Sequence, residues 1–471
     1  MTQRLRGALF LVVAMLLGAC ATVPSLDREM LRTGRAPTVV LEGAHGPLSH
    51  AQSEKILADL KKRSPETSIF DSHVAVEEAL AGNTLSVGNR AVLLENGQAT
   101  YASMLQAIRG ARNHIHLESY IFEGDEVGQE FAQALAERRR AGVQVRVLYD
   151  AVGSLDTPKE FFDELRAQGV EVVAYNPLSA TTVLTDATRL NHRDHRKLTI
   201  VDGRVAFLGG INISSVYTGS SGSGSSGSAG SSKPKPKQQP FDTPWRDTQV
   251  RLEGPVVADL QRAFIANWES QSKQKLEGPG LLPKLQPQGR ELVRAIPASP
   301  DMGPNPLYVA LISAIESADT AVNLTNAYFV PHAELLAALK AAARRGVRVR
   351  IILPSRTDSW LVFNAGRSYY DEMLEAGIQV FERRDRLLHS KTASIDGVWA
   401  TVGSTNLDWR SLVFNDELNA VVLGPEFAAQ LDAAFEQDIA HSQAITLAQW
   451  EHRPLADRMR ELVARTWAHM L

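Results

Sequence analysis

The sequence contains a single cysteine, Cys20, among its 471 residues. One cysteine excludes a disulfide within the chain and a metal site built from cysteine ligands. The sequence also lacks an excess of charge of either sign, because 50 Lys and Arg residues face 53 Asp and Glu residues, which leaves a net charge of −3. Such a balance gives no general attraction to nucleic acid. We therefore expect no nucleic acid partner, although a local basic groove would remain compatible with one.

Long apolar runs are scarce as well. The run Ala8–Ala19 follows a basic start. At about a dozen residues it is too short to cross a bilayer and typical of the core of a signal peptide. It closes with Leu17-Gly-Ala-Cys20, which resembles the processing box of bacterial lipoproteins, so that residues 1–20 would be a signal peptide and Cys20 the lipid-modified residue. An ordinary cleaved signal and an uncleaved short anchor are the alternatives.

The lipoprotein interpretation also predicts a location. The residue after Cys20 is Ala21 and not Asp, which by resemblance to lipoprotein sorting rules favours the outer membrane. Several acyl chains would anchor the protein firmly, since one chain alone binds only marginally. We therefore expect a membrane-anchored lipoprotein of a bacterial cell envelope, on the periplasmic face of the outer membrane, with a membrane surface as a partner.

One short pattern occurs twice in the chain. Both copies obey His-x-Lys-x4-Asp-x6-Gly-small-x-Asn. The first copy contains His195, Lys197, Asp202 and Asn212, and the second contains His389, Lys391, Asp396, Ser404 and Asn406. Two matches with identical spacing in one chain are far more specific than a single match.

The residues around each copy indicate a β-hairpin. Leu198–Val201 and Thr392–Ile395 are apolar and β-branched, and each is followed by an Asp-Gly dipeptide that favours a tight turn. Residues two apart share one face of a strand, so each histidine projects beside the lysine of its own copy. An imidazole with a reference pKa of about 6.5 beside a permanent cation can attack an anionic phosphate.

The aspartates of the two copies, Asp202 and Asp396, lie at the expected turns. We interpret them mainly as residues that hold the hairpins. As members of the motif they are also counted with the catalytic set of His195, Lys197, His389 and Lys391.

The surroundings of the two copies repeat as well. Gly142–Leu148 matches Gly346–Ile352, and strands alternate with helices in both halves. This alternation predicts two α/β domains, each with a mostly parallel or mixed sheet flanked by helices. The expected organisation is the signal peptide at residues 1–20, a tether and peripheral helix at 21–66, a first domain at 67–286 with a flexible Gly/Ser insertion at 219–237, a second domain at 287–445 and a C-terminal amphipathic helix at 446–471.

A carboxylate follows each copy at an equivalent place. When the dipeptides Gly254-Pro255 and Gly424-Pro425 are aligned, Asp247 falls opposite Glu417. A carboxylate that accepts a hydrogen bond from Nδ1 of a histidine leaves Nε2 free to act as nucleophile or base. We predict that Asp247 and Glu417 orient the two histidines; a surface acid on a strand edge is the alternative.

The first copy alone also contains candidate metal ligands, His192 and Asp194, beside His195. The second copy has no ligands at the corresponding positions. Because a site shared by two copies would need ligands from both, we expect neither a metal nor another cofactor.

The doubled motif resembles the signature of the phospholipase D superfamily, and within it the chain is most similar to bacterial cardiolipin synthases. The resemblance covers residues 67–440 and is carried by the two motif copies, Trp245–Thr248, Tyr328–Pro331, Arg367–Tyr370 and Ser404–Ser411. It implies that the two domains pack as a pseudo-twofold pair with both motifs in one active site. One histidine would form a phosphohistidine and the other would serve as acid and base; we assign His195 as nucleophile and His389 as acid/base, although the near symmetry allows the reverse. Lys197 and Lys391 would neutralise the phosphate, with Asn212, Asn406 and Ser404 as further phosphate-binding residues.

The same resemblance implies phospholipid substrates and a phosphatidyltransferase of the cardiolipin synthase type, with phosphatidylglycerol or another alcohol as acceptor. Two alternatives stay open. One is hydrolysis at the same site by a phospholipase D-type phosphodiesterase or, less in keeping with the charge, a nuclease. The other is a lipid-anchored binding protein with an inactive site, against which the intact motifs argue.

The C-terminal segment carries apolar residues at helical spacing. Leu455, Met459, Leu462, Val463 and Trp467 would share a face, with arginines mostly off it. This pattern predicts either an interfacial membrane helix or a terminal helix packed on the domain.

Overall fold

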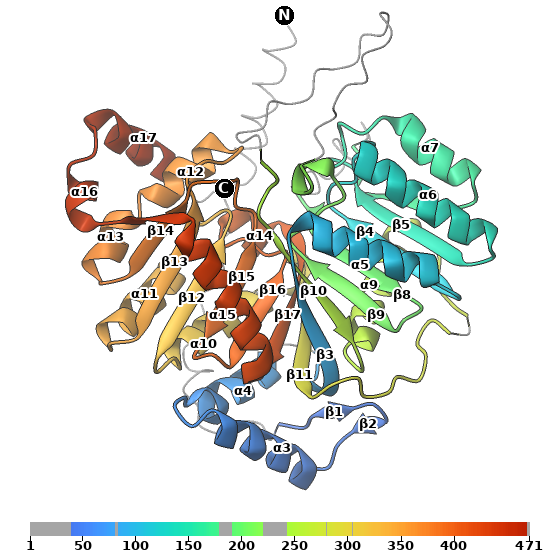
Figure 1. Cartoon of the computed structure of the whole chain (residues 1–471), viewed down its shortest axis with the longest axis horizontal. Helices are drawn as coiled ribbons and strands as arrows, with labels where there is room; N and C mark the ends of the chain where they lie inside the picture. Colours follow the sequence, from blue (N-terminus) through green and yellow to red (C-terminus); the bar gives the residue numbers. More distant parts are fainter. Residues whose placement is uncertain are drawn as a thin grey trace, which may run out of the picture.

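Two halves of the same architecture lie side by side in the computed structural model (Figure 1), as the sequence repeat predicts. The structure describes residues 39–80, 83–178, 191–219, 243–278, 280–303 and 305–468. Cys20 and the Gly/Ser insertion, apart from Gly219, fall outside these residues, so the predictions made for them are not addressed by the structure.

Each half contains a mixed sheet with the same strand order. In the first half, three parallel strands are followed by antiparallel ones, in the order β6-β5-β4-β8-β9-β10-β3. The second half repeats this order as β14-β13-β12-β15-β16-β17-β11, with β18 added beside β14. The first-half strands are β3 (Ser86–Glu95), β4 (His114–Ser119), β5 (Gln144–Asp150), β6 (Glu171–Tyr175), β8 (Lys197–Val201), β9 (Val205–Gly209) and β10 (Thr248–Glu253). The second-half strands are β11 (Glu291–Ala298), β12 (Ala321–Asn326), β13 (Arg348–Pro354), β14 (Gln379–Arg383), β15 (Lys391–Ile395), β16 (Trp399–Gly403), β17 (Asn415–Leu423) and β18 (Ser442–Ile445).

Each motif copy forms the hairpin that its sequence predicts. Strand β8 pairs antiparallel with β9, and β15 pairs antiparallel with β16. The turn residues Asp202 and Asp396 have φ values of 53° and 52°. This left-handed conformation is disfavoured for most residues but tolerated by Asp, which explains the Asp-Gly dipeptide at each turn.

Helices cover both faces of the sheets. Those of the first half are α5 (Asn96–Gly110), α6 (Glu126–Arg140), α7 (Lys159–Ala167) and α9 (Val257–Ser272). Those of the second half are α10 (Pro306–Glu316), α11 (Ala333–Arg344), α12 (Trp360–Arg367), α13 (Tyr370–Glu375), α14 (Trp409–Val413) and α15 (Pro425–Ala440). Helix α6 begins at the N-cap Asp125, whose Oδ1 accepts a hydrogen bond from the Gly128 N–H at 2.9 Å.

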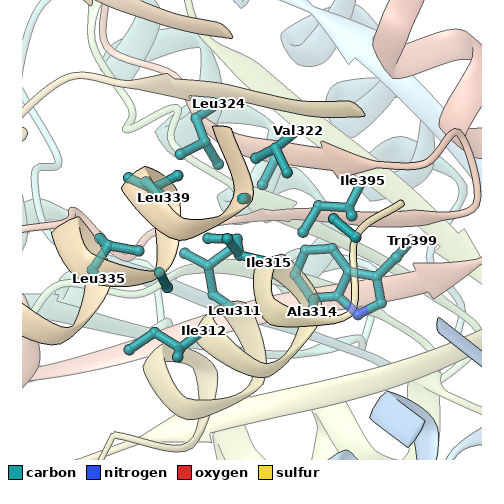
Figure 2. Close-up of a cluster of buried hydrophobic side chains, with 14 of the residues drawn as sticks. Leu311, Ile312, Ala314, Ile315, Val322, Leu324, Leu335, Leu339, Ile395 and Trp399 are labelled. Carbon is teal, nitrogen blue, oxygen red and sulfur yellow. The ribbon is translucent and has the colours of Figure 1, made fainter. Parts of the chain in front are cut away.

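Helix α10 is the centre of the second-half core. Its residues are apolar around most of the helix, as expected for a helix with no face in water. Figure 2 shows Leu311 and Ile315 of α10 beside Leu335 and Leu339 of α11, against side chains of β12 and β15. This packing holds β15, which carries part of the second histidine motif, and its neighbour β12.

The two halves are joined through their sheets and a shared core. Strand β3 pairs antiparallel with β11. Buried side chains from β9, β10 and α9 form one cluster with side chains from β16, β17 and α15. Because the halves share this core, the ends of β8 and β15 are held in a fixed relation, and with them the two motifs.

The N-terminal part differs from its predicted place. The sequence assigns residues 21–66 to a tether with a peripheral helix and starts the first domain at residue 67. In the structure, α3 (His50–Arg63) is present, and α4 (Ile69–Leu80) packs against α10 of the second half. The side chains of Leu41, Leu60 and Ile69 are buried in the core of that half. Residues 39–80 and 83–85 therefore belong with the second half, because buried apolar side chains among them complete its core. The short β1 (Glu42–Gly43) pairs with β2 (Gly46–Pro47) and with β3.

The C-terminal segment forms two short helices in place of the single helix expected at residues 446–471. These are α16 (Leu447–Glu451) and α17 (Leu455–Arg465), separated by Pro454. Within the described ranges, no helix has both the length and the apolar character needed to cross a bilayer.

Candidate active site

The two histidines lie just before β8 and β15, and each is tied to the opposite half through its backbone. Residues 193–194, which form β7 (Arg193–Asp194), pair with the start of β17, and the His195 N–H donates to the carbonyl oxygen of Asp416 at 2.9 Å. In the second copy the His389 N–H donates to the carbonyl oxygen of Arg246 at 2.8 Å. The pseudo-twofold relation of the halves therefore includes the backbone hydrogen bonds of the two histidines.

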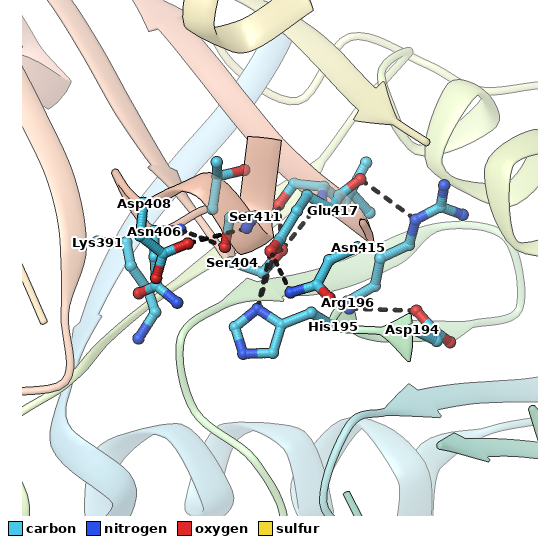
Figure 3. Close-up of polar contacts among 12 residues, drawn as sticks. Asp194, His195, Arg196, Lys391, Ser404, Asn406, Asp408, Ser411, Asn415 and Glu417 are labelled. Carbon is cyan, nitrogen blue, oxygen red and sulfur yellow. Dashed lines mark hydrogen bonds and ion pairs between the residues drawn. The ribbon is translucent and has the colours of Figure 1, made fainter. Parts of the chain in front are cut away.

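Each histidine receives its carboxylate from the other half. Nδ1 of His195 lies 3.0 and 3.1 Å from the two carboxylate oxygens of Glu417. Nδ1 of His389 lies 2.7 Å from Oδ2 of Asp247. Figure 3 shows His195 from the first half meeting Glu417 from the second. Both predicted carboxylates contact a histidine, and each contacts the histidine of the other half. This arrangement leaves Nε2 of each ring free to face a substrate.

Both rings line one cavity of about 360 Å³ between the halves. Aromatic rings of the lining lie against both histidines, with Tyr120 at 5.0 Å from His195 and Trp245 at 5.5 Å from His389 between ring centroids. It consists of Tyr120, Ile121, His195, Asn212, Trp245, Tyr328, Asp358, Ser359, Val362, His389, Asn406, Asp408, Arg410, Ser411 and Asn415. Both imidazoles therefore open onto the same cavity.

The two lysines are buried behind this lining. Nζ of Lys197 donates to the carbonyl oxygen of His195 at 2.6 Å, and Lys391 makes the same contact with His389. Tyr120 and Tyr328, which line the cavity, lie with their ring centroids 5.1 and 5.9 Å from these ammonium groups. The arrangement places two positive charges next to the cavity.

Burial and mutual repulsion shift the titration of these groups. Burial lowers the pKa of His195 well below its ordinary value, and the nearby lysine charges lower it further. Burial also lowers the pKa of His389, but Asp247 opposes that shift. Burial lowers the pKa of Lys197 to about 7 and that of Lys391 to about 8, in each case opposed by the two orienting carboxylates. A bound anion would stabilise the protonated forms of these lysines and histidines, so the site favours an added negative charge.

The two motif asparagines differ in how their side chains are held. Asn212 and Asn406 both line the cavity. Nδ2 of Asn212 donates to the Tyr217 hydroxyl at 3.2 Å, and its Oδ1 accepts from the Ile121 N–H at 3.1 Å. Oδ1 of Asn406 is buried without a hydrogen-bond partner. Asn406 is therefore the less restrained of the two amides.

Ser404 does not contact the cavity, so its assignment as a phosphate-binding residue is wrong. Its side chain is fully buried, and its hydroxyl donates to Oε2 of Glu417 at 2.5 Å. The burial of Glu417 raises the pKa of its carboxyl to about 7, and Lys197 and the hydroxyl of Ser404 oppose that shift. In the first copy Gly210 takes this position, and a Cβ there would lie 2.2 Å from Oδ1 of Asp247. Asp247, which has the shorter side chain, thus lies directly against the backbone of Gly210, whereas Glu417 is held by the hydroxyl of Ser404.

Asp202 and Asp396 lie at the hairpin turns and not among the residues that line the cavity. The carboxylate of Asp202 accepts from the backbone N–H groups of Arg112, Asn113 and His114 at 2.7–3.2 Å. Asp396 accepts in the same way from residues 319–321 at 2.9 Å. Their inclusion in the catalytic set is therefore corrected to the structural role that the hairpin interpretation gives them.

Several residues that contact the histidines or line the cavity were missed by reasoning from the sequence. Tyr217 lies five residues after Asn212, and Ser411 lies five residues after Asn406. The hydroxyl of Tyr217 is 3.3 Å from Nδ1 of His389. Tyr120 packs edge-on against His195 with a centroid separation of 5.0 Å. The repeat contained a signal for Tyr217 and Ser411, since a comparison of the segments after the two asparagines places them at equivalent positions.

The metal candidates of the first copy are separated by the fold. Nε2 of His192 lies 2.9 Å from Oδ1 of Asp416, while Asp194 contacts Asn267 and the backbone N–H of Arg196. Among the residues with described positions, no group of three or more His, Cys, Asp or Glu side chains is arranged to hold a metal ion.

Comparison with known proteins gives matches for both halves and for the whole fold. A family model described as "Cardiolipin synthase, PLD-like domain" matches residues 104–220 and 311–439. A cardiolipin synthase of Geobacillus kaustophilus is 35% identical over 389 residues, which cover 82% of this chain and 73% of that protein. The major cardiolipin synthase ClsA of Bacillus subtilis is 33% identical over 385 residues, covering 81% and 76%. The crystal structure of a phosphatidylserine synthase from Haemophilus influenzae has a similar fold, with a TM-score of 0.62 at 14% identity over 84% of this chain and 96% of that one.

Proposed function

Because this chain belongs to the cardiolipin synthase family of phospholipase D-like enzymes, we propose that it transfers a phosphatidyl group from one phosphatidylglycerol molecule to another. The products are cardiolipin and glycerol. The observation that carries the proposal is the exchange of carboxylates, which points two oriented imidazoles from homologous motifs into one cavity.

In the first step Nε2 of His195 attacks the phosphorus of the donor lipid. A phosphorus–nitrogen bond forms, the phosphorus–oxygen bond to the glycerol headgroup breaks, and His389 donates a proton to the leaving oxygen. The pKa of His195 is lowered well below its usual value, which suits a neutral nucleophile, whereas Asp247 favours the charged form of His389.

In the second step His389 takes the proton back from the hydroxyl of the acceptor phosphatidylglycerol. The acceptor oxygen then attacks phosphorus and the bond to His195 breaks, which restores the enzyme. Lys197 and Lys391 stabilise the charge that develops on the nonbridging oxygens, and Asn212 and Asn406 offer amide donors. If water enters in place of the acceptor, the product is phosphatidic acid.

The proposal extends to the location of the enzyme. A lipid on Cys20 would hold the catalytic halves at the periplasmic face of the outer membrane, where the phospholipid substrates are. Labelling with a radioactive fatty acid tests the lipid attachment on which this location depends: label should enter the wild-type protein and be absent from Cys20→Ala. Recovery of unlabelled wild-type protein in a soluble fraction contradicts it.

The transfer itself is tested with purified protein and phosphatidylglycerol vesicles, with the lipids resolved by chromatography and the released glycerol measured. Cardiolipin and glycerol should appear in equal amounts for the wild type and be lost in His195→Ala and in His389→Ala. Phosphatidic acid as the only product would instead establish a hydrolase. Acid-quenched protein digested for mass spectrometry identifies the nucleophile, since the phosphatidyl group should reside on the peptide containing His195.

A further inference from the structure

Helix α17 is inverted relative to the usual orientation of an amphipathic helix. Its large apolar side chains face solvent: Leu455 is 72% exposed, Leu462 58%, Met459 53% and Val463 50%. The side chains that face the protein are Glu461 and Ala464, which are 2% and 0% exposed. At 3.6 residues per turn, these two groups lie on opposite sides of the helix.

The inverted orientation is fixed by specific contacts. Ala464 packs with Ala365 of α12 and with Val330. The carboxylate of Glu461 accepts from Nε of Arg453 at 2.9 Å and lies 3.7 Å from Nε of Arg367. On the same helix, Arg465 pairs with Glu372 of α13 at 2.8 Å. Turning the apolar side inward would leave the buried carboxylate of Glu461 without these partners, so the exposed apolar stripe is part of the folded state.

Arginines flank the apolar stripe on both sides. Arg458 and Arg465 lie on one side of it and Arg460 on the other, and all three are exposed. Arg465 also pairs with Glu372 at 2.8 Å and Arg460 with Asp457 at 3.0 Å, so that Arg458 is the one of these three with no ion pair to a carboxylate among the described residues. Long cationic side chains at the edges of an apolar helix face can extend toward phosphate groups while the face itself enters the acyl region. A second copy of α17 would bring like charges together, whereas a surface with anionic headgroups complements them.

The position of α17 connects it to the cavity of the active site. It packs against α12 (Figure 1), and Val362 of α12 belongs to the cluster around Ala464 and also lines that cavity. Trp360, at the first turn of α12, is 54% exposed. A surface that receives α17 is therefore one helix away from the point where the lipid phosphate must enter.

We propose that α17 is a membrane-docking helix that lies in the interface of a phospholipid bilayer with anionic headgroups and presents the mouth of the active site to it. The inference rests on the proposed function only in the choice of partner. It assigns to the chain a second contact with the membrane, independent of any lipid on Cys20.

The test uses full-length protein carrying Cys20→Ser, so that no acyl chain contributes to binding. Co-sedimentation is measured with vesicles of phosphatidylglycerol mixed with phosphatidylcholine and with vesicles of phosphatidylcholine alone. The pair Met459→Ser and Leu462→Ser should lower the partition coefficient on the anionic vesicles at least tenfold, because burying one such side chain is worth roughly a factor of ten. Leu282→Ser is the matched control, since Leu282 is 49% exposed on the loop before β11, and it should bind like the parent.

A second measurement separates docking from catalysis. Turnover of a short-chain, monomeric phosphatidylglycerol should be unchanged in the α17 variant, while turnover on vesicles falls with binding. Binding can be scored even in a protein without transferase activity, so a failed transferase assay does not decide this question. Unchanged vesicle binding by the α17 variant overturns the proposal, as does equal binding of the parent protein to both vesicle types. Two further results contradict it: light scattering that shows a dimer of the parent protein dissociating in the variant, and a variant that loses thermal stability but keeps its vesicle binding.

Discussion

At the scale of single residues, catalysis depends on pairs that are distant in the chain. His195 and Glu417 are 222 positions apart, and Asp247 and His389 are 142 apart. A carboxylate on Nδ1 fixes the tautomer of the ring and stabilises its charged form. Each half thus supplies one histidine and the carboxylate that orients the histidine of the other half.

The exchange of carboxylates predicts which histidine responds to which substitution. Asp247→Asn should lower kcat by roughly 10²- to 10⁴-fold, because His389 loses the group that stabilises its protonated form. Nitrogen-15 NMR of labelled histidine should show a changed Nδ1 signal for His389 and an unchanged one for His195. Glu417→Gln is the matched variant and should give the reverse pattern; a change at the histidine of the same half would contradict the crossed arrangement.

The lowered pKa values of the lysines predict an unusual pH dependence of anion binding. Lys197 and Lys391 lose their charge near pH 7 and 8, well below the value for an exposed lysine. A competitive anion should therefore bind tightly below pH 7 and progressively more weakly above pH 8. The inhibition constant of sulfate, which does not itself titrate in this range, measures the effect. Constant inhibition up to pH 10 would show that the lysines keep ordinary pKa values.

At the scale of secondary-structure elements, the two motif hairpins are anchored by their aspartates. Each carboxylate gathers three backbone N–H groups from the segment before the neighbouring strand, β4 or β12. The motif therefore carries its own structural support, separate from its chemistry.

Removing one anchor should affect stability more than chemistry. Asp202→Ala is expected to lower the free energy of unfolding by about 1–3 kcal/mol, because three backbone N–H groups, of which that of His114 is partly buried, lose their acceptor. Asp202→Asn keeps one acceptor oxygen and tolerates the left-handed conformation, so its loss should be smaller. Urea unfolding measures both. If the folded fraction of Asp202→Ala lost activity as completely as His195→Ala, the residue would have a direct catalytic role.

At the scale of the whole molecule, the halves are a single structural unit. The antiparallel pair β3–β11 and the shared core between α9 and α15 join the halves. In addition, residues 39–80 and 83–85 precede the first half in the chain but pack on the second. Separation of the halves would expose this core and break both histidine–carboxylate pairs.

The shared core predicts cooperative unfolding. Peptides from β9 and β16 should lose hydrogen-exchange protection at the same denaturant concentration, because neither half retains its core when the other unfolds. Leu252→Ala, in the shared core, should shift both midpoints together by an amount typical of a buried leucine, about 2–5 kcal/mol. Two separated midpoints would show that the halves are independent domains.

The doubled motif and the residues around it predict the two hairpins, the repeated α/β order and the carboxylate that accompanies each copy. These features are encoded by spacing and by the periodicity of strands and helices, which are local properties. Tertiary structure alone decided that the carboxylates are exchanged, that Ser404 supports Glu417 and that α4 completes the core of the second half. It also decided that α17 turns its apolar face outward. These outcomes depend on how the two sheets pack together and on which buried polar groups form hydrogen bonds with each other. Both are contacts between distant segments, and the spacing of residues along the chain does not specify them.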